Sequence, residues 1–189
     1  MLKRVLIIKM IVKATSCYEN AKSGNLVSIT GDGGNAWGFF GSSYKRMAPR
    51  LYLWKYYNEN PDIEIIEEEN SGDEAIEIAL SSIVDNLTED ELIRWYIQEF
   101  FDLRLKELDP YMFLNDLNQK FGNEIILLCH ESPGASINIK HFCHRRLIAD
   151  WLELETGLII PEISIDENGR IIKEDVYDLK PYIRKLIRK

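Results

Sequence analysis

The side chains best suited to chemistry are concentrated between Ile125 and Trp151. This stretch holds all three histidines and two of the three cysteines, namely Cys129, His130, His141, Cys143 and His144. Ile125 to Leu128 is a short aliphatic run of the kind that forms a buried strand. From Cys143 to Thr156, apolar residues recur at helical spacing, and Gly157 follows as a stop signal. The stretch therefore predicts a strand, a loop and a helix that begins at Cys143.

The start of that helix has the composition of an anion-binding and proton-transfer site. Free backbone N–H groups and the helix dipole favour an anion there, and they also lower the pKa of a cysteine at that position. Arg145 supplies a planar fork of donors for phosphate or carboxylate. His144 can exchange a proton near neutral pH. Glu131 follows the strand and can accept a hydrogen bond from a ligand or act as a base.

In an open α/β sheet, ligands bind beyond the carboxyl ends of the strands, where Cys129 and Glu131 are expected. We therefore predict one pocket there. The residues assigned to chemistry are Cys143, His144 and Glu131, and those assigned to ligand binding are Cys129, Arg145, Tyr44 and Lys45. No metal-binding residue and no cofactor is assigned.

Three alternatives compete with this pocket. A cysteine phosphatase loop needs an arginine six residues after the cysteine, but Ala149 stands there. Zinc ligation by the cysteines and histidines has suitable residue types, but the spacing matches no common zinc pattern and the neighbours Cys143 and His144 rarely ligate one ion together. In the purely structural alternative, the two cysteines are small buried residues and Arg145 pairs with an acid such as Glu131.

The other expected elements alternate strands with helices, which predicts an α/β fold with a mainly parallel sheet and helices on both faces. Thr88 and Glu91 form a capping-box pattern, and Asn168-Gly169 is a type I′ hairpin signal. A polar loop is expected from Thr15 to Asn25. Strands are expected at Val5–Val12, Leu26–Thr30, Leu158–Ile160 and Glu162–Ile165, with Ile163–Ile165 paired to Arg170–Ile172. Helices are expected at Arg50–Asn58, Ala75–Val84, Thr88–Lys106, Asp109–Lys120 and Tyr177–Lys189.

Length and composition limit the class of protein. The 189 residues suit one domain, which we place at 1–161, followed by a hairpin and basic helix at 162–189. The formal net charge of -8 argues against general nucleic-acid affinity. Scattered cysteines and the lack of a long apolar run predict a cytoplasmic protein with no membrane segment. The acidic segment from Asp62 to Glu77 is expected to be a solvated insertion rather than a cation site.

The central stretch resembles the family known as domain of unknown function 488. The resemblance rests on Cys129-His-Glu131 after a strand, Cys143-His-Arg145 at the next helix start, and the upstream segment Tyr44-Lys-Arg-Met-Ala-Pro49. It extends from about Leu26 to Pro161 and implies a Rossmann-like α/β fold. It implies no established activity. The chain departs from the family pattern in a longer loop before Cys143 and in Arg146, where serine or histidine is common.

Two functions remain open. The first is binding, with or without processing, of a nucleotide-like anionic small molecule at the predicted pocket. The second is a non-enzymatic interaction module in which the Cys-His-Arg segment is structural, while the acidic segment and the basic C-terminal helix contact partners. Burial separates the two, because an open pocket favours the first and full burial with mutual pairing favours the second. The sequence assigns neither an enzyme class nor an oligomeric state.

Overall fold

The computed structural model describes residues 11–31, 33–36, 38–48, 88–130 and 143–187. Several predictions fall on other residues and so lie outside the described part. These are most of the strand at Val5–Val12, the helices at Arg50–Asn58 and Ala75–Val84, the acidic segment from Asp62 to Glu77, and Glu131.

A four-stranded sheet forms the centre of the fold, in the order β1-β6-β2-β5 with every neighbouring pair parallel. Its strands are β1 (Val12–Cys17), β2 (Asn25–Ser28), β5 (Ser42–Ser43) and β6 (Ile125–Cys129). Every residue of β6 is buried, because it has a parallel neighbour on each side and layers above and below. The α/β class, the parallel sheet and the central strand are thereby confirmed.

The expected loop from Thr15 is wrong, because β1 continues to Cys17. Polar residues can lie in this buried strand because their hydroxyl groups have partners. The Thr15 hydroxyl donates to Glu162 and the Ser16 hydroxyl to the Ile163 carbonyl. Their polarity had indicated a loop, since buried hydroxyls are costly when they lack such partners.

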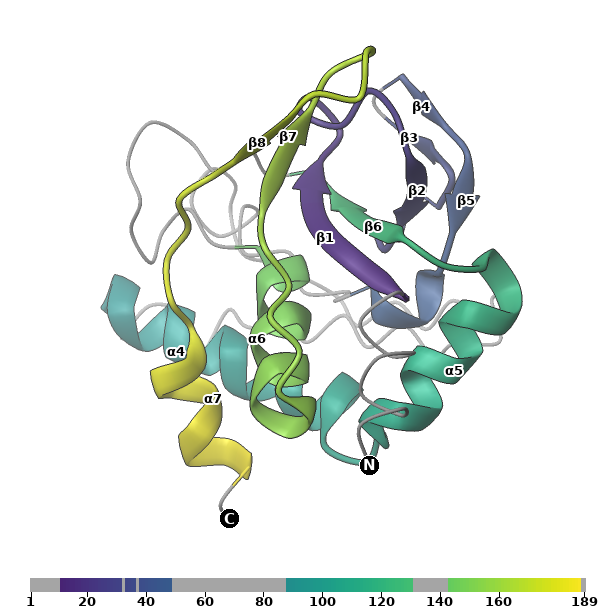
Figure 1. The fold of residues 1–189 in the computed structure, drawn as a ribbon. Coiled ribbons are helices and arrows are strands. Elements are labelled where there is room, and N and C mark those ends of the chain that lie inside the picture. The colour runs from purple at the N-terminus through teal and green to yellow at the C-terminus, as the bar shows by residue number, and fades with distance from the viewer. Residues whose placement is uncertain (1–10, 32, 37, 49–87, 131–142, 188–189) are drawn as a thin grey trace.

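In the described part of the chain, four α-helices lie on one side of the sheet (Figure 1). They are α4 (Glu89–Phe100), which continues as the π-helical turn η2 (Phe101–Leu105), α5 (Pro110–Phe121), α6 (His144–Thr156) and α7 (Lys180–Ile187), with a 3₁₀ turn η1 at Lys45–Met47. The Thr88–Glu91 capping box is present. Asp109 caps α5, whose C-cap is Gly122, and α6 ends at Gly157. The boundaries of α4 with η2, of α5 and of α6 are as predicted, except for the π-helical geometry of η2. The last helix begins at Lys180 rather than at Tyr177, and the expected strand at Leu158–Ile160 does not form.

The two faces of the sheet are covered differently. The large core cluster joins Val27, Ile125 and Leu127 to residues of all four α-helices. The smaller cluster, on the opposite face, joins Ile126 and Leu128 to the C-terminal hairpin. In the part of the chain that the structure describes, helices therefore cover only one face, and the expectation of helices on both faces is not met there.

The described residues also form two hairpins. Strands β7 (Ile163–Ile165) and β8 (Ile171–Lys173) pair antiparallel as predicted, and parallel bridges at Thr15–Glu162 and Ala21–Ile165 join the hairpin to the edge of the sheet beyond β1. The predicted type I′ turn is wrong. A type I′ turn needs two successive residues with positive φ, but within this loop only Gly169 has one, of 78°. The Gly169 N–H donates to the Asp166 carbonyl, so the loop is a type I turn followed by a left-handed glycine. The second hairpin pairs β3 (Asn35–Ala36) with β4 (Phe39–Phe40).

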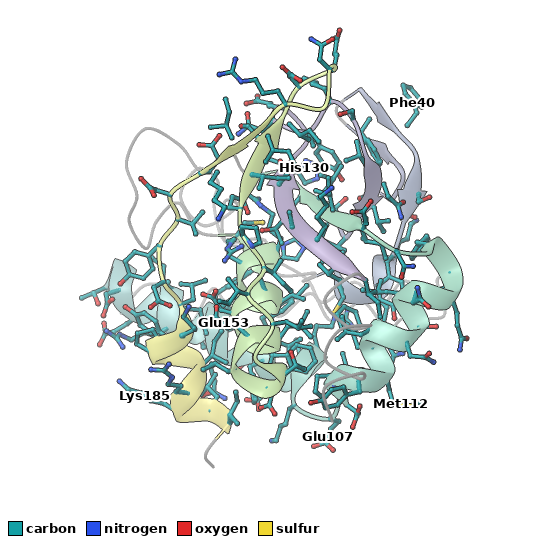
Figure 2. All side chains as sticks on the ribbon, in the orientation of Figure 1. Phe40, Glu107, Met112, His130, Glu153 and Lys185 are labelled. Carbon is teal, nitrogen blue, oxygen red and sulfur yellow. The ribbon has the colours of Figure 1, made fainter. Side chains whose placement is uncertain are left out.

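Exposed apolar side chains are few among the described residues. Phe40 and Met112 point outward with 78% and 67% of their surface exposed (Figure 2). Among the helices that the structure describes, none combines the length and apolar character of a membrane span.

Candidate functional site

The carboxyl end of β6 meets the beginning of α6, so the fold places Cys129 opposite Cys143. Cys129 is the last residue of the central strand. Cys143 is the N-cap of α6, in extended conformation, and its side chain makes no capping hydrogen bond. The next residues, from His144 to Leu152, are all buried. The residues that begin α6 therefore lie inside the protein.

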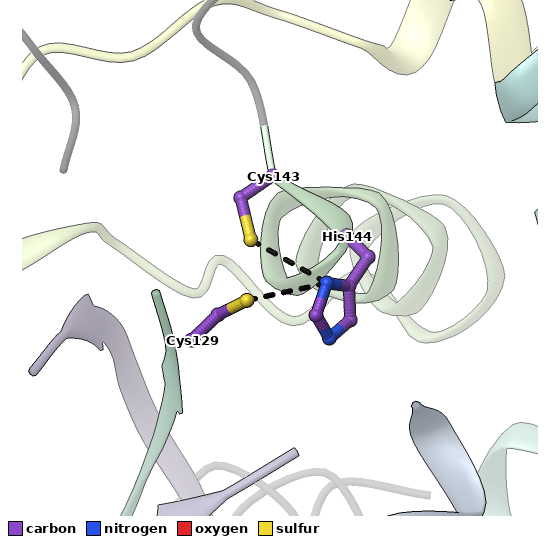
Figure 3. Close-up of side chains that lie close together, drawn as sticks. All are labelled: Cys129, Cys143 and His144. Atoms are coloured by element: carbon purple, nitrogen blue, oxygen red, sulfur yellow. Dashed lines mark hydrogen bonds between the residues drawn. The ribbon is translucent and has the colours of Figure 1, made fainter. Parts of the chain in front are cut away.

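Cys129, Cys143 and His144 form a compact group that we call the Cys-His cluster (Figure 3). The Nδ1 atom of His144 lies 3.3 Å from the Cys129 sulfur and 3.5 Å from the Cys143 sulfur. The Nε2 atom lies 3.1 Å from the Ile29 carbonyl oxygen. A carbonyl oxygen can only accept, so Nε2 carries the proton and donates. In the neutral ring, the Nδ1 lone pair then faces both sulfurs.

The surroundings of Cys143 favour its thiolate form. Burial by itself would raise the pKa of this thiol. A hydrogen bond from Cys129 and the positive charge of Arg145 outweigh burial and hold the pKa well below its ordinary value, and His144 adds its charge and a hydrogen bond in the state in which Nδ1 is also protonated. The position at the helix N-terminus acts in the same direction. A lowered pKa favours the thiolate, which is the reactive and metal-binding form of cysteine.

A second group begins at the next residue of α6, and we call it the ion-pair network: Thr15, Arg145, Arg146, Asp150 and Glu162. Arg145 and Glu162 are its centre, with only 2% of the Arg145 surface exposed. The Arg145 Nε donates to both carboxylate oxygens of Glu162, at 2.9 and 3.2 Å, and Nη2 lies 2.9 Å from Oε1. The two nitrogens on one edge of the planar guanidinium, Nε and Nη2, thus both face the Glu162 carboxylate.

The remainder of the network links Glu162 to β1 and to the start of α7. The Thr15 hydroxyl donates to Glu162 over 2.5 Å and accepts from Arg146 Nη1 over 2.7 Å. Arg146 Nη2 lies 3.3 Å from Asp150, which also accepts from the Leu179 backbone N–H. Burial raises the pKa of Asp150, although Arg146 and the Leu179 N–H act to lower it.

Two buried nitrogens of the network make no hydrogen bond within the described structure: Nη1 of Arg145 and Nε of Arg146. The Arg145 guanidinium is also close enough to the sulfurs of Cys129 and Cys143 for their charges to raise its pKa, against burial, which lowers it. Arg145 therefore belongs to both groups. One side of its fork holds Glu162, and Nη1 is an N–H donor with no acceptor.

The predicted site residues separate into two sets. The structure brings Cys129, Cys143, His144 and Arg145 together. Tyr44 lies elsewhere: its hydroxyl donates to Asp116 of α5 over 2.6 Å, and burial, followed by this carboxylate, raises its pKa to about 12. Lys45 is exposed in η1 and lies beside Gly33.

The remaining histidine of the described residues is not part of the site. The His130 ring packs edge-on against Tyr18, with centroids 5.2 Å apart, and lies among the strands in Figure 2. The partner of Arg145 is Glu162, which the sequence reasoning did not consider. An acid directly after Pro161 and before the apolar strand β7 was the available signal, because a charge at the start of a buried strand needs a partner.

A cavity of about 440 Å³ lies elsewhere, between η2, α6 and α7. Phe101, Leu105, Trp151 and Leu186 are among its lining residues, and no member of the Cys-His cluster is. The site at the start of α6 is thus a buried group of side chains rather than a wall of this cavity.

No protein-family model, no curated protein and no solved structure matches the chain.

Proposed function

We propose that the protein binds a small, nucleotide-like anionic ligand at the start of α6 and that the adjacent Cys143 and His144 carry out chemistry on it. The observation that supports this most directly is the buried Nη1 of Arg145, an N–H donor without an acceptor in the described structure. An unpaired donor on a buried cation is costly, and a phosphate or carboxylate oxygen would remove that cost.

The helix supports the same proposal. α6 is 13 residues long, and no side chain of its N-cap occupies the backbone N–H groups of its first turn. These groups and the helix dipole favour a negative charge. Arg145 would contribute one further N–H, while Glu162 holds the other side of its guanidinium in a fixed orientation.

The chemical roles follow from the low pKa of Cys143 and from the shared imidazole. Cys143 would act as the nucleophile, because the thiolate is the reactive form of cysteine. His144, held by the Ile29 carbonyl, would accept or return a proton at Nδ1. Glu131, outside the described residues, keeps its predicted role at the ribose or base of the ligand.

The test is a thermal-shift screen of the chelator-treated protein against inorganic phosphate, nucleoside monophosphates and sugar phosphates. A ligand at one hundred times its dissociation constant stabilises the folded state by about 2.7 kcal/mol. The decisive variant is the double substitution Arg145→Leu/Glu162→Leu, which removes both charges and leaves neither buried alone. Arg94→Ala on the exposed face of α4 is the control. We expect the shift in wild type and in the control, and its loss in the double variant.

A second function is favoured by a different observation. His144 and Arg145 are 3% and 2% exposed, and Arg145 is paired, which fits a structural role for the segment in a protein that binds partners through its surface. Arg184 and Lys185 on α7 supply exposed positive charge for such a surface. A screen in which no anion shifts the melting temperature, with the double variant folded and merely altered in stability, would support this function and contradict the first.

A further inference from the structure

We propose that the Cys-His cluster is a binding site for a thiophilic divalent cation of the zinc class, with Cys129, Cys143 and His144 as its three protein ligands. The cluster offers one donor atom from each residue: two sulfurs and Nδ1 of the imidazole. These three atoms all lie within 4.8 Å of one another. The inference goes beyond the proposed function and does not depend on anion binding. A bound ion would occupy the Cys143 sulfur and the His144 Nδ1, so the nucleophile and base roles proposed for these atoms apply to the metal-free protein.

The two nitrogen–sulfur separations agree with tetrahedral coordination. Zinc lies about 2.3 Å from sulfur and about 2.0–2.1 Å from imidazole nitrogen, so a tetrahedral angle places sulfur about 3.6 Å from nitrogen. The structure has 3.3 Å from Nδ1 to the Cys129 sulfur and 3.5 Å to the Cys143 sulfur. An ion can therefore contact Nδ1 and either sulfur after displacements of a few tenths of an ångström. The two sulfurs lie within 4.8 Å of each other, and tetrahedral coordination places them about 3.8 Å apart.

The orientation of His144 is the one that a metal ligand requires. A ligating histidine usually donates its other ring N–H to a carboxylate or a backbone carbonyl, which fixes both the tautomer and the ring plane. His144 does this through Nε2 and the Ile29 carbonyl. Its Nδ1 lone pair faces two sulfurs at once (Figure 3), although a single lone pair accepts only one S–H hydrogen bond well. A cation would coordinate both sulfurs and Nδ1 at the same time.

Charge balance also supports a cation. The ion-pair network contains two positive side chains, Arg145 and Arg146, and two negative ones, Glu162 and Asp150, so it is neutral by itself. It has no spare positive charge for two buried thiolates. A divalent cation bound to the deprotonated Cys129 and Cys143 makes the cluster neutral as well, which avoids the high cost of an uncompensated charge in the interior.

The cluster explains how a spacing unlike the common zinc patterns still yields a site. Common patterns place pairs of ligands on one short turn, whereas here Cys129 ends a strand and Cys143 and His144 begin a helix. Cys143 has an extended backbone as the N-cap, and His144 is the first helical residue, so adjacent side chains can turn toward one point. Three protein ligands leave a fourth position for another group, as in catalytic zinc sites.

The experiment is a metal titration of the reduced full-length protein, with no anion added. Zn²⁺ would be titrated in competition with a chromophoric chelator, and Co²⁺ would be used as a spectroscopic substitute whose visible bands report tetrahedral geometry and thiolate ligation. We expect one ion per chain, with tetrahedral cobalt bands that include sulfur-to-metal charge transfer. Wild-type protein that binds no ion, or shows octahedral cobalt bands, overturns the proposal without any variant.

Variants then assign the ligands. Removal of a group that merely orients a ligand weakens metal binding by about 10–100-fold. Cys129→Ser, Cys143→Ser and His144→Ala each remove a direct ligand and should exceed that loss. The matched control is Cys17→Ser, because Cys17 is the third buried cysteine and the register partner of Cys129 on β1, yet lies outside the cluster.

The outcomes are distinguishable. Zinc bound equally by Cys17→Ser and wild type, and lost from the three cluster variants with unchanged circular dichroism, supports the site. Equal binding by every variant contradicts it, as does a Cys129–Cys143 disulfide whose reduction restores no zinc binding. If cluster variants unfold, the wild-type cobalt spectrum decides. Anion binding is tested separately in chelator, so either proposal can fail while the other stands.

Discussion

The Cys-His cluster and the ion-pair network begin at consecutive residues of the same helix, yet their polar groups have different kinds of partner. His144 points its Nδ1 toward two sulfurs that a single lone pair cannot both satisfy. Arg145 meets Glu162 in a forked pair, and Thr15 adds a short hydrogen bond to the same carboxylate. The network pairs its charges with one another but keeps two buried N–H donors, Arg145 Nη1 and Arg146 Nε, without an acceptor in the described structure, whereas the cluster gathers three metal-ligand atoms around one point.

This difference separates structural from functional polarity in a buried region. A paired network that crosses from α6 to β1 and β7 fixes where the helix begins relative to the sheet. The cluster lies at the same end of α6, so its two sulfurs and the His144 Nδ1 are held in place before any ligand binds. Such fixed positions reduce the reorganisation that binding would otherwise require.

The largest loss of stability is expected when the ion pair at the centre of the network is broken. Glu162→Gln leaves the Arg145 charge buried without its counter-ion, and loss of one partner of a buried ion pair costs about 3–5 kcal/mol. Urea unfolding would measure the free energy, with Glu167→Gln in the exposed hairpin loop as control. A loss under about 1 kcal/mol would show that the network does not stabilise the fold.

Zinc should stabilise the fold only through the cluster and independently of the ion-pair network. At one hundred times its dissociation constant it should raise the free energy of unfolding by about 2.7 kcal/mol in wild type. Glu162→Gln should gain a similar amount from its lower starting point, while Cys129→Ser should gain none. Unfolding curves in zinc and in chelator provide the measurement. If Glu162→Gln also fails to respond, the two groups cannot be treated as separate.

A smaller loss is expected at the edge of the network. Thr15→Val removes the hydroxyl that donates to Glu162 and accepts from Arg146, and hydrogen bonds to charged groups contribute about 1.5–3 kcal/mol. Thr15→Ser keeps the hydroxyl and serves as the control. Equal stability of the valine and serine variants would mean that this bond is not a significant part of the network.

The smallest effect is the pH dependence of the metal-free cluster. The folded pKa of Cys143 is lowered, so its stabilising contribution is complete above the unfolded value of about 8.5 and is lost as the pH falls through the folded pKa. In that window, wild type should gain at most about 1.4 kcal/mol per pH unit over Cys143→Ser. Unfolding in chelator across the range measures the slopes, and parallel slopes would refute the assignment of the thiolate to Cys143.

Local sequence patterns predicted the elements that carry the site. The aliphatic run before Cys129 predicted β6, and the apolar spacing after Cys143, with its terminal Gly157, predicted α6. These signals lie within a few residues of the structure they specify. The extension of β1 through Thr15 was missed, because the partner that makes this polar residue acceptable in a strand is Glu162, far along the chain.

The sequence by itself determined which chemical groups are present and that a strand and a helix would carry them. The tertiary structure decided which of them meet. Parallel pairing brings Cys129 of β6 to the edge where α6 begins, and the Ile29 carbonyl after β2 selects the His144 tautomer. The hairpin beside β1 delivers Glu162 to Arg145. These contacts join residues distant in sequence, and their energies depend on burial and geometry that no local spacing encodes.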